Sequence, residues 1–307
     1  DVYKRQTFFR QLGFSVLLSP RSTRKIYELG MESIPTESEC YPAKLAHGHV
    51  QWLIDHGVRT IFHPCVFYEH QETPGAQNHF NCPIVVSYPE NLKNNVDAIG
   101  EDGVTYLRPF LAFTDEKTAA KRLADFCKET WGISASETRA AVHAAWLEQQ
   151  HAKTDIRAQG AAALAWIEQN HGRGIVLAGR PYHVDPEINH GIDHLITRHG
   201  AAVVTEDSIS NRVEKFPTSV LNQWTYHSRL YAAAKYCTTQ NDMDLVQLVS
   251  FGCGVDAITT DETREILQEG GKLYTQLKID EITNLGAVNI RLRSLFAALD
   301  ERDEDKK

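Results

Sequence analysis

The sequence has no apolar run that approaches the roughly 18 residues needed for a membrane-spanning helix. Its first residues, Asp1 to Gln6, lack the apolar segment of a secretory signal peptide and carry no fold signal. It also lacks a block of basic residues, and its formal net charge is −8. We therefore expect a cytoplasmic protein whose main partner is neither a membrane nor nucleic acid.

Several catalytic and cofactor motifs are missing as well. The chain contains no phosphate-binding G-x-x-x-x-G-K-S/T loop, no G-x-G-x-x-G motif after a strand and no Ser/His/Asp triad pattern. Its six cysteines form no C-x-x-C pair, so neither a zinc ribbon nor a ferredoxin-type run fits. In a cytoplasmic protein these cysteines are expected to be reduced thiols or ligands rather than disulfides.

The sequence does contain an alternation of helices and short apolar strands, which is typical of a parallel α/β sheet. Strands are predicted at 14–19, 58–63, 84–87, 106–113, 175–179, 202–205, 255–259 and 273–279. Helices of the second half are predicted at 187–199, 220–236, 245–250, 260–269 and 285–299. We expect an N-terminal α/β domain at 7–133, a connector of one or two long helices at 134–171, broken near Gly160, and a C-terminal α/β domain at 172–300.

Four cysteines lie in segments that resemble loops and have prolines or glycines nearby. They are Cys40, Cys65, Cys82 and Cys253. Cys40 precedes a helix predicted to begin at Pro42, where the helix dipole favours thiolate over thiol. Four loop thiolates suggest a tetrahedral site for zinc or an iron–sulfur cluster, and structural cysteines are the alternative.

The other cysteines are expected at different places relative to strands and helices. Cys65 is expected directly after a strand, at the carboxyl edge of a sheet, whereas Cys82 is expected directly before one. Cys127 and Cys237 fall on apolar helix faces, so we expect them in the core.

A second polar cluster occurs where the strand predicted at 175–179 gives way to a helix. Its candidate substrate-binding residues are Arg180, Tyr182, His183 and His190. Asp185 is placed to cap that helix, with Pro186 at its first position. A helix start beside a sheet edge is a reasonable anion or substrate site, and a well-capped helix with solvated polar residues is the alternative. A similar loop occurs at 278–286, and no catalytic residue is assigned.

Seven short motifs taken together resemble a known family. They are Glu39-Cys40-Tyr41-Pro42-Ala43-Lys44, Phe62-His63-Pro64-Cys65, Asn81-Cys82-Pro83, Arg180-Pro181-Tyr182-His183, the segment 185–191, Ser250-Phe251-Gly252-Cys253-Gly254 and Lys278-Ile279-Asp280-Glu281. The chain resembles, from about 14 to 299, a domain of unknown function related to 2-hydroxyacyl-CoA dehydratase and benzoyl-CoA reductase subunits. That domain occurs in fusion proteins that also carry the ATP-dependent activator, the CoA-substrate-specific enzyme activase.

The resemblance implies two Rossmann-like open parallel-sheet domains joined by long helices, with a 4Fe-4S cluster in the cleft between them. The ligands it implies are Cys40, Cys65, Cys82 and Cys253. A double cubane is the other cluster type in such systems, and it would require Cys127 and Cys237 to leave the core. The implied role is electron transfer in an ATP-activated 2-hydroxyacyl-CoA dehydratase or reductase-type system, as a lyase or low-potential reductase component.

The implied partners follow from the same resemblance. The chain lacks the activator domain, so an ATP-dependent activator is expected on another segment or chain, with an acyl-CoA as substrate, and a dimer is left open. The rival hypothesis is a non-catalytic docking or structural module for the activase, zinc-bound or metal-free. A third is a small-molecule transferase that uses the 180–190 loop without metal.

Overall fold

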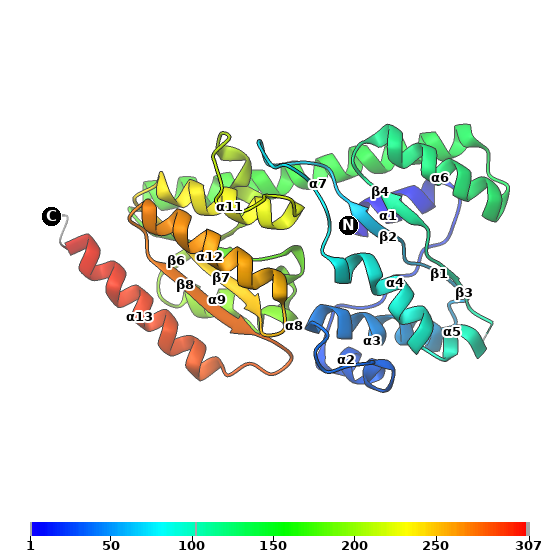
Figure 1. Ribbon diagram of the computed structural model, residues 1–307, viewed down its shortest axis with the longest axis horizontal. Helices are drawn as coiled ribbons and strands as arrows, with labels where there is room; N and C mark the ends of the chain where they lie inside the picture. Colours follow the sequence, from blue (N-terminus) through cyan, green and yellow to red (C-terminus); the bar gives the residue numbers. More distant parts are fainter. Residues whose placement is uncertain (1, 102, 305–307) are drawn as a thin grey trace. The chain divides into compact units, whose positions relative to one another are not determined.

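The computed structural model describes residues 2–101 and 103–304, and its elements are labelled in Figure 1. The chain divides into two compact units. Unit 1 comprises Asp1–Gln71 and Asn78–Asp155, and unit 2 comprises Glu72–Gln77 and Ile156–Lys307. Helices and parallel strands occur in both, so the predicted α/β class is confirmed. Every helix in the described ranges is too short or too polar to cross a membrane.

Unit 1 is mostly helical. Its elements in chain order are α1 (Val2–Gln11), α2 (Arg24–Gly30), η1 (Met31–Ser33), α3 (Tyr41–Asp55), β1 (Thr60–Phe62), β2 (Cys65–Tyr68), α4 (Pro83–Asn95), α5 (Ala98–Glu101), β3 (Thr105–Leu107), β4 (Phe110–Ala112), α6 (Glu116–Trp131) and the first part of α7 (Ala135–Gln169). Cys127 is fully buried in a core formed largely by α6, α7 and β4, as predicted.

The strands of unit 1 form one interrupted parallel ladder. β1 pairs with β3 and β2 pairs with β4, and the register continues from one pair to the next, since Thr60 faces Thr105 and Cys65 faces Phe110. Pro64 separates β1 from β2 because proline has no N–H to donate to a ladder. The first half therefore carries two short strand pairs among its described residues, rather than a wide open sheet.

Two predicted strands of unit 1 are wrong. The segment 14–19 forms no strand: Leu17 and Leu18 are exposed, while Phe14 packs on Phe9 and Trp131. The segment 84–87 belongs to α4, which begins at Pro83 directly after Cys82. Proline suits a first helical position, and this start signal outweighs the β-branched residues that follow it. Cys82 therefore caps a helix.

Helices α2 and α3 cross at two glycines. A Cβ placed on Gly48 would overlap the carbonyl oxygen of Ile26, and one placed on Gly30 would overlap the backbone of Gly48. The absence of both side chains lets the two helices approach at backbone distance. The N-terminus of α3, which follows Cys40, is positioned by this contact.

Unit 2 has a single parallel sheet. Its elements are the rest of α7, β5 (Arg173–Ala178), η2 (Pro181–Val184), α8 (Pro186–Asn189), α9 (Ile192–Thr197), β6 (Ala201–Thr205), α10 (Glu206–Ile209), η3 (Ser210–Arg212), α11 (Thr225–Thr238), β7 (Met243–Ser250), α12 (Gly254–Glu269), β8 (Tyr274–Ile279) and α13 (Leu285–Glu304). The strand order is β6-β5-β7-β8, and every pair is parallel.

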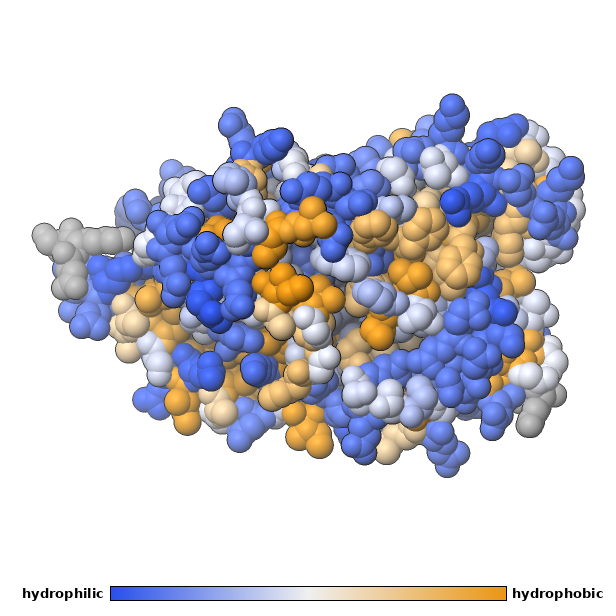
Figure 2. Space-filling model, viewed as in Figure 1, coloured by the Kyte–Doolittle hydropathy of each residue, from blue (hydrophilic) through white to orange (hydrophobic). Residues whose placement is uncertain are grey.

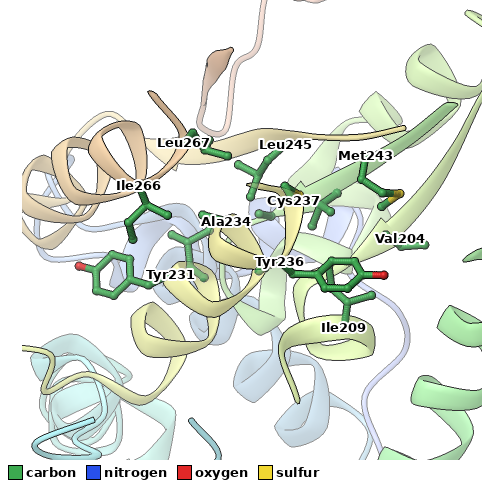
Figure 3. Packing of buried hydrophobic residues seen from close by; sticks show 14 of the residues in the cluster. Val204, Ile209, Tyr231, Ala234, Tyr236, Cys237, Met243, Leu245, Ile266 and Leu267 are labelled. Carbon is green, nitrogen blue, oxygen red and sulfur yellow. The ribbon is translucent and has the colours of Figure 1, made fainter. Parts of the chain in front are cut away.

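The central strand of this sheet is covered on both faces. All eight residues of β7 are buried, which is the pattern of a strand between two layers of helices. Helices α11 and α12 pack on the sheet and on each other, while α13 packs on β8 and α9. Figure 3 shows part of the core, in which Cys237 of α11 lies with Leu245 and Met243 of β7. The prediction that Cys237 is a core residue is confirmed.

Several secondary-structure predictions for unit 2 are wrong. The predicted helix 245–250 is part of β7, and the predicted strand 255–259 lies in α12. A strand buried on both faces shows no alternation, so its sequence cannot be told from a buried helix. In α12 the Thr259 and Thr263 hydroxyls donate to backbone carbonyls one turn earlier, which accommodates β-branched residues in the helix. The predicted helix 187–199 is two short helices, α8 and α9.

The long helix α7 is continuous through Gly160, where a break was predicted. A Cβ at Gly160 would meet the Cβ of Ser208 at 2.5 Å. This glycine therefore serves close packing within unit 2 rather than ending the helix.

We predict that Gly48→Ala destabilises unit 1 by about 2 kcal/mol or more, because the added methyl must push the backbones of α2 and α3 apart. Gly100→Ala is the matched control, since a Cβ there meets nothing within 4 Å. Differential scanning calorimetry of the full chain measures both. A melting temperature of Gly48→Ala equal to that of the control would show that the helices do not cross this closely.

Candidate functional site

The carboxyl edge of the unit 2 sheet gathers polar side chains from three loops. β5 ends at Ala178 and is followed by Arg180, while β7 ends at Ser250 and is followed by α12. In the order β6-β5-β7-β8, the chain leaves β5 toward β6 and leaves β7 toward β8. The boundary between β5 and β7 is thus a topological switch point, which is where open α/β sheets bind ligands.

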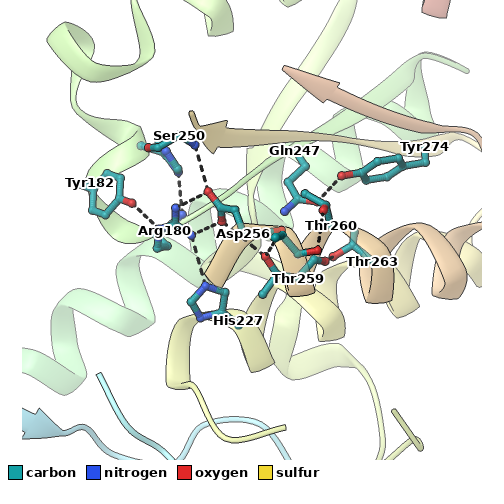
Figure 4. Close-up of polar contacts among 12 residues, drawn as sticks. Arg180, Tyr182, His227, Gln247, Ser250, Asp256, Thr259, Thr260, Thr263 and Tyr274 are labelled. Carbon is teal, nitrogen blue, oxygen red and sulfur yellow. Dashed lines mark hydrogen bonds and ion pairs between the residues drawn. The ribbon is translucent and has the colours of Figure 1, made fainter. Parts of the chain in front are cut away.

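A buried ion pair spans this point (Figure 4). The Arg180 guanidinium donates from Nη2 to Asp256 Oδ2 at 2.7 Å and from Nη1 to Oδ1. The backbone N–H of Ser250 also donates to Asp256, at 3.0 Å. Although burial opposes ionisation of Asp256, the hydrogen bond and charge of Arg180 hold the pKa of this carboxyl below its usual value.

Two histidines flank the arginine. His183 Nδ1 accepts from the backbone N–H of Arg180 at 2.9 Å, and His227 Nε2 lies 3.3 Å from Arg180 Nη1. Burial, and then the charge of Arg180, lowers the pKa of each histidine to about 3, although Asp256 opposes the shift. Both imidazoles are therefore neutral at neutral pH.

Three further residues near Arg180 complete its surroundings, namely Tyr182, Cys253 and Gly179. Its Nε donates to the hydroxyl of Tyr182. Cys253 caps α12 without a side-chain bond, and burial raises the pKa of its thiol, although Arg180 lowers it. A Cβ on Gly179 would overlap the His183 ring, so only glycine fits between β5 and this histidine.

The four predicted substrate residues are divided between two places. Arg180, Tyr182 and His183 lie together, as described above. His190 has a positive φ of 54°, and its Nε2 lies 2.6 Å from the carbonyl oxygen of Asp280. This contact joins the loop after α8 to the loop after β8. His190 therefore stabilises the carboxyl edge of the sheet and is not part of the Arg180 cluster. His227 and Asp256 were missed by the sequence reasoning.

The four predicted cysteine ligands form no disulfide, and they belong to different units. Cys40, Cys82 and Cys253 each cap a helix, α3, α4 and α12 respectively, and none uses its sulfur in a cap bond. Cys65 begins β2 instead of following a strand, and it is fully buried. In the part of the chain that the structure describes, no three His, Cys, Asp or Glu side chains come together as a metal site. The cluster stays a prediction.

The loop that carries Cys40 is fixed by buried polar contacts within unit 1. The Asn91 side chain donates to Glu39, and Glu39 Oε2 lies 3.8 Å from His47 Nε2. His47 Nδ1 is 2.8 Å from the hydroxyl of Ser33. Burial lowers the pKa of His47 to about 4, so this ring is neutral and its contacts are hydrogen bonds rather than ion pairs.

Cys40 and Cys65 both lie near α4. The Cys40 sulfur is 3.4 Å from the hydroxyl of Tyr88. Burial, and then the charge of Glu90, raises the pKa of the Cys65 thiol, although Arg108 lowers it. Arg108 in turn pairs with Glu90 at 2.7 Å.

A family model described as the CoA enzyme activase uncharacterised domain matches residues 3–209. The match includes Cys40, Cys65 and Cys82 and the segment from Arg180 to His190. It ends before His227, Cys253 and Asp256. No curated protein matches the chain.

We predict that Asp256→Asn destabilises unit 2 by about 3 kcal/mol or more, because it leaves the buried Arg180 charge without a counter-charge. The exposed Asp261→Asn, which removes a surface pair with Arg264, should change stability by less than about 0.5 kcal/mol. Urea unfolding measures both. Since the pKa of Asp256 is lowered in the folded state, its contribution is full above the ordinary aspartate pKa of 3.8 and is lost as the pH falls below it. Equal midpoints for the two variants at pH 7 would contradict the buried pair.

We also predict an acid sensitivity from the two histidines. Their pKa falls from an ordinary 6.5 to about 3 on folding, so the unfolded chain binds more protons in that range. Stability should be full above pH 6.5 and fall as the pH drops toward 3, by about 1.4 kcal/mol per pH unit for each ring. His227→Gln should flatten this slope, whereas exposed His194→Gln should not. An unchanged slope in His227→Gln would mean that this ring is protonated in the folded protein.

Proposed function

Because the chain belongs to the CoA enzyme activase uncharacterised domain family, we propose that it serves a CoA-enzyme activation system by holding an iron–sulfur cluster on cysteine thiolates. The ligands we propose are Cys40, Cys65, Cys82 and Cys253. The observation that carries the proposal is that three of these four uncrosslinked thiols cap helices. The positive end of the helix dipole suits the charge of a metal-bound thiolate, and iron binds thiolate.

The donor set fits a cluster in number and in chemistry, since four thiolates are the usual ligands of a cubane. The Tyr88 hydroxyl is placed to donate a hydrogen bond to a Cys40 thiolate, and such bonds to sulfur tune the reduction potential. Cys65 is buried with a raised pKa, so its proton would leave only on binding a metal. When bound, the cluster would supply single electrons at low potential.

In this proposal the chain works with an ATP-dependent activator on another segment or chain, which would deliver the electron. The electron would then pass to a CoA thioester enzyme reaction of the dehydratase or reductase type. The residues of this chain would hold the cluster, exclude water from it and position the partner. The presence of a second copy in a dimer is compatible with this role.

A second candidate function is a metal-free docking module for the activase. It is favoured by one observation, namely that the described residues include no cluster of three ligand side chains. In this case the cysteines would be structural, and binding of the activator would not depend on them.

We predict that the full chain, reconstituted without oxygen, binds about four iron and about four sulfide per chain. Cys82→Ser and Cys253→Ser should each lose most of the iron, because a cubane held by three thiolates is weakened. Cys237→Ala removes a core thiol, and this variant should keep its iron. Iron and acid-labile sulfide analysis measures all four proteins.

The same proteins distinguish the two candidates. Binding of zinc without sulfide, or retention of iron by both serine variants, would contradict the proposed iron–sulfur cluster. If no metal binds and a variant with all four proposed ligands changed to serine still binds the ATP-dependent activator, the docking module is the function.

A further inference from the structure

Unit 1 contains a pocket that enters its core and is lined by residues of α1, β1, β4, α6 and α7 and by Phe113. The empty space in it is about 440 Å³, part of which is open to solvent, and this is the size range of ligand pockets. All twelve lining residues belong to unit 1. The pocket therefore depends on one unit alone, and none of the four proposed cysteine ligands lines it.

The wall of this pocket is apolar and rich in aromatic rings, which include Phe8, Phe62, Phe113 and Trp146. Phe8 and Phe113 are only 5% and 8% exposed. Figure 2 shows other hydrophobic side chains that reach the surface over β2 and β4 of unit 1, whereas the pocket is formed by core side chains. Water gains few hydrogen bonds from such a wall, so an apolar group replaces it favourably.

Lys4 places a charge on this apolar wall. The residue is 9% exposed, and its Nζ lies 4.1 Å from the centre of the Phe113 ring. Because Phe113 itself lines the pocket, the ammonium group lies at the pocket wall rather than in bulk water. Its Nζ is also 3.8 Å from Glu69 Oε2, which is an ion pair at a distance too long for a direct hydrogen bond.

The charges at the wall favour an acidic ligand. Glu69 is held through its other oxygen, since Oε1 accepts from the Asn81 side chain at 3.2 Å. Arg5 is a second cation on the wall, and no acid occurs among the described residues that line the pocket. A ligand carboxylate could approach the Lys4 ammonium to direct hydrogen-bond distance, and such charge-assisted bonds are the strong ones. A neutral apolar molecule would use the aromatic wall but gain nothing from the cations.

We propose that this pocket of unit 1 binds a small free carboxylic acid, with its apolar body among the aromatic side chains and its carboxylate on Lys4. The arrangement matches ligand sites in general, in which an apolar pocket carries a few polar groups that fix orientation. A thioester has no such negative charge. The proposal therefore rests neither on the iron–sulfur cluster nor on a CoA substrate.

The experiment compares binding of hexanoate and of its neutral analogue 1-hexanol to the full chain, by ligand-observed NMR titration before iron reconstitution. Lys4→Met keeps the apolar stem and removes the charge, and exposed Lys128→Met is its control. Ala145→Leu fills the pocket, and exposed Ala140→Leu on the same helix is its control. Lys4→Met should weaken hexanoate roughly tenfold and leave 1-hexanol unchanged, whereas Ala145→Leu should weaken both ligands at least tenfold.

Several outcomes would overturn the proposal. They are no binding of hexanoate to the folded wild type, equal binding by Lys4→Met and wild type, and binding unaffected by Ala145→Leu. Tighter binding of 1-hexanol than of hexanoate would show an apolar cavity that does not recognise an acid, which also contradicts it. If a variant fails to fold, Lys4→Met/Glu69→Gln, which removes both charges, and Val142→Ile, which fills the pocket less, replace the two. Because no iron is present, a failed cluster does not affect the result.

Discussion

The buried pair of Arg180 and Asp256 is the interaction on which the second unit depends. Arg180 follows β5 and Asp256 lies in the first turn of α12, so their contact closes the switch point of the sheet. A single buried charge would cost several kcal/mol, so either residue requires the other. Arg180 has a second consequence: its guanidinium can only donate and so fixes the proton position on His227, while its backbone N–H fixes the proton position on His183.

The two units carry different chemistry. Unit 1 presents Cys40 and Cys82 at helix starts, with Cys65 buried nearby on β2, and this is chemistry suited to metal thiolates. Unit 2 presents a buried Arg180–Asp256 pair flanked by two neutral imidazoles. The family match ends at residue 209, so it contains Arg180 and His183 but not the Asp256 that balances the arginine. From the matched segment alone, Arg180 would be interpreted as a free anion-binding residue. Its guanidinium is instead bound to Asp256, which lies outside that segment.

The sequence was sufficient for the α/β class, for the core positions of Cys127 and Cys237, and for the grouping of Arg180, Tyr182 and His183 at a sheet edge. Those features depend on local signals, such as strand-to-helix transitions and apolar helix faces. It was insufficient for Asp256 and His227, because β7 is buried on both faces and shows no period. Because β7 was predicted as a helix, the start of α12 was predicted as a strand, and Asp256 was assigned to that strand. The start of α4 was missed for a related reason, since Ile84, Val85 and Val86 favour a strand locally but follow a helix-starting proline. His227 lies on an apolar helix, where its role depends wholly on the tertiary partner Arg180.

The most direct test of this account is the protonation state of the two buried rings, measured by nitrogen-15 NMR on histidine-labelled full chain at pH 7. We predict that both are neutral, with the proton of His183 on Nε2 and that of His227 on Nδ1. A charged ring at either buried position, or the opposite tautomer, would contradict the claim that Arg180 and Asp256 set the chemistry of the edge.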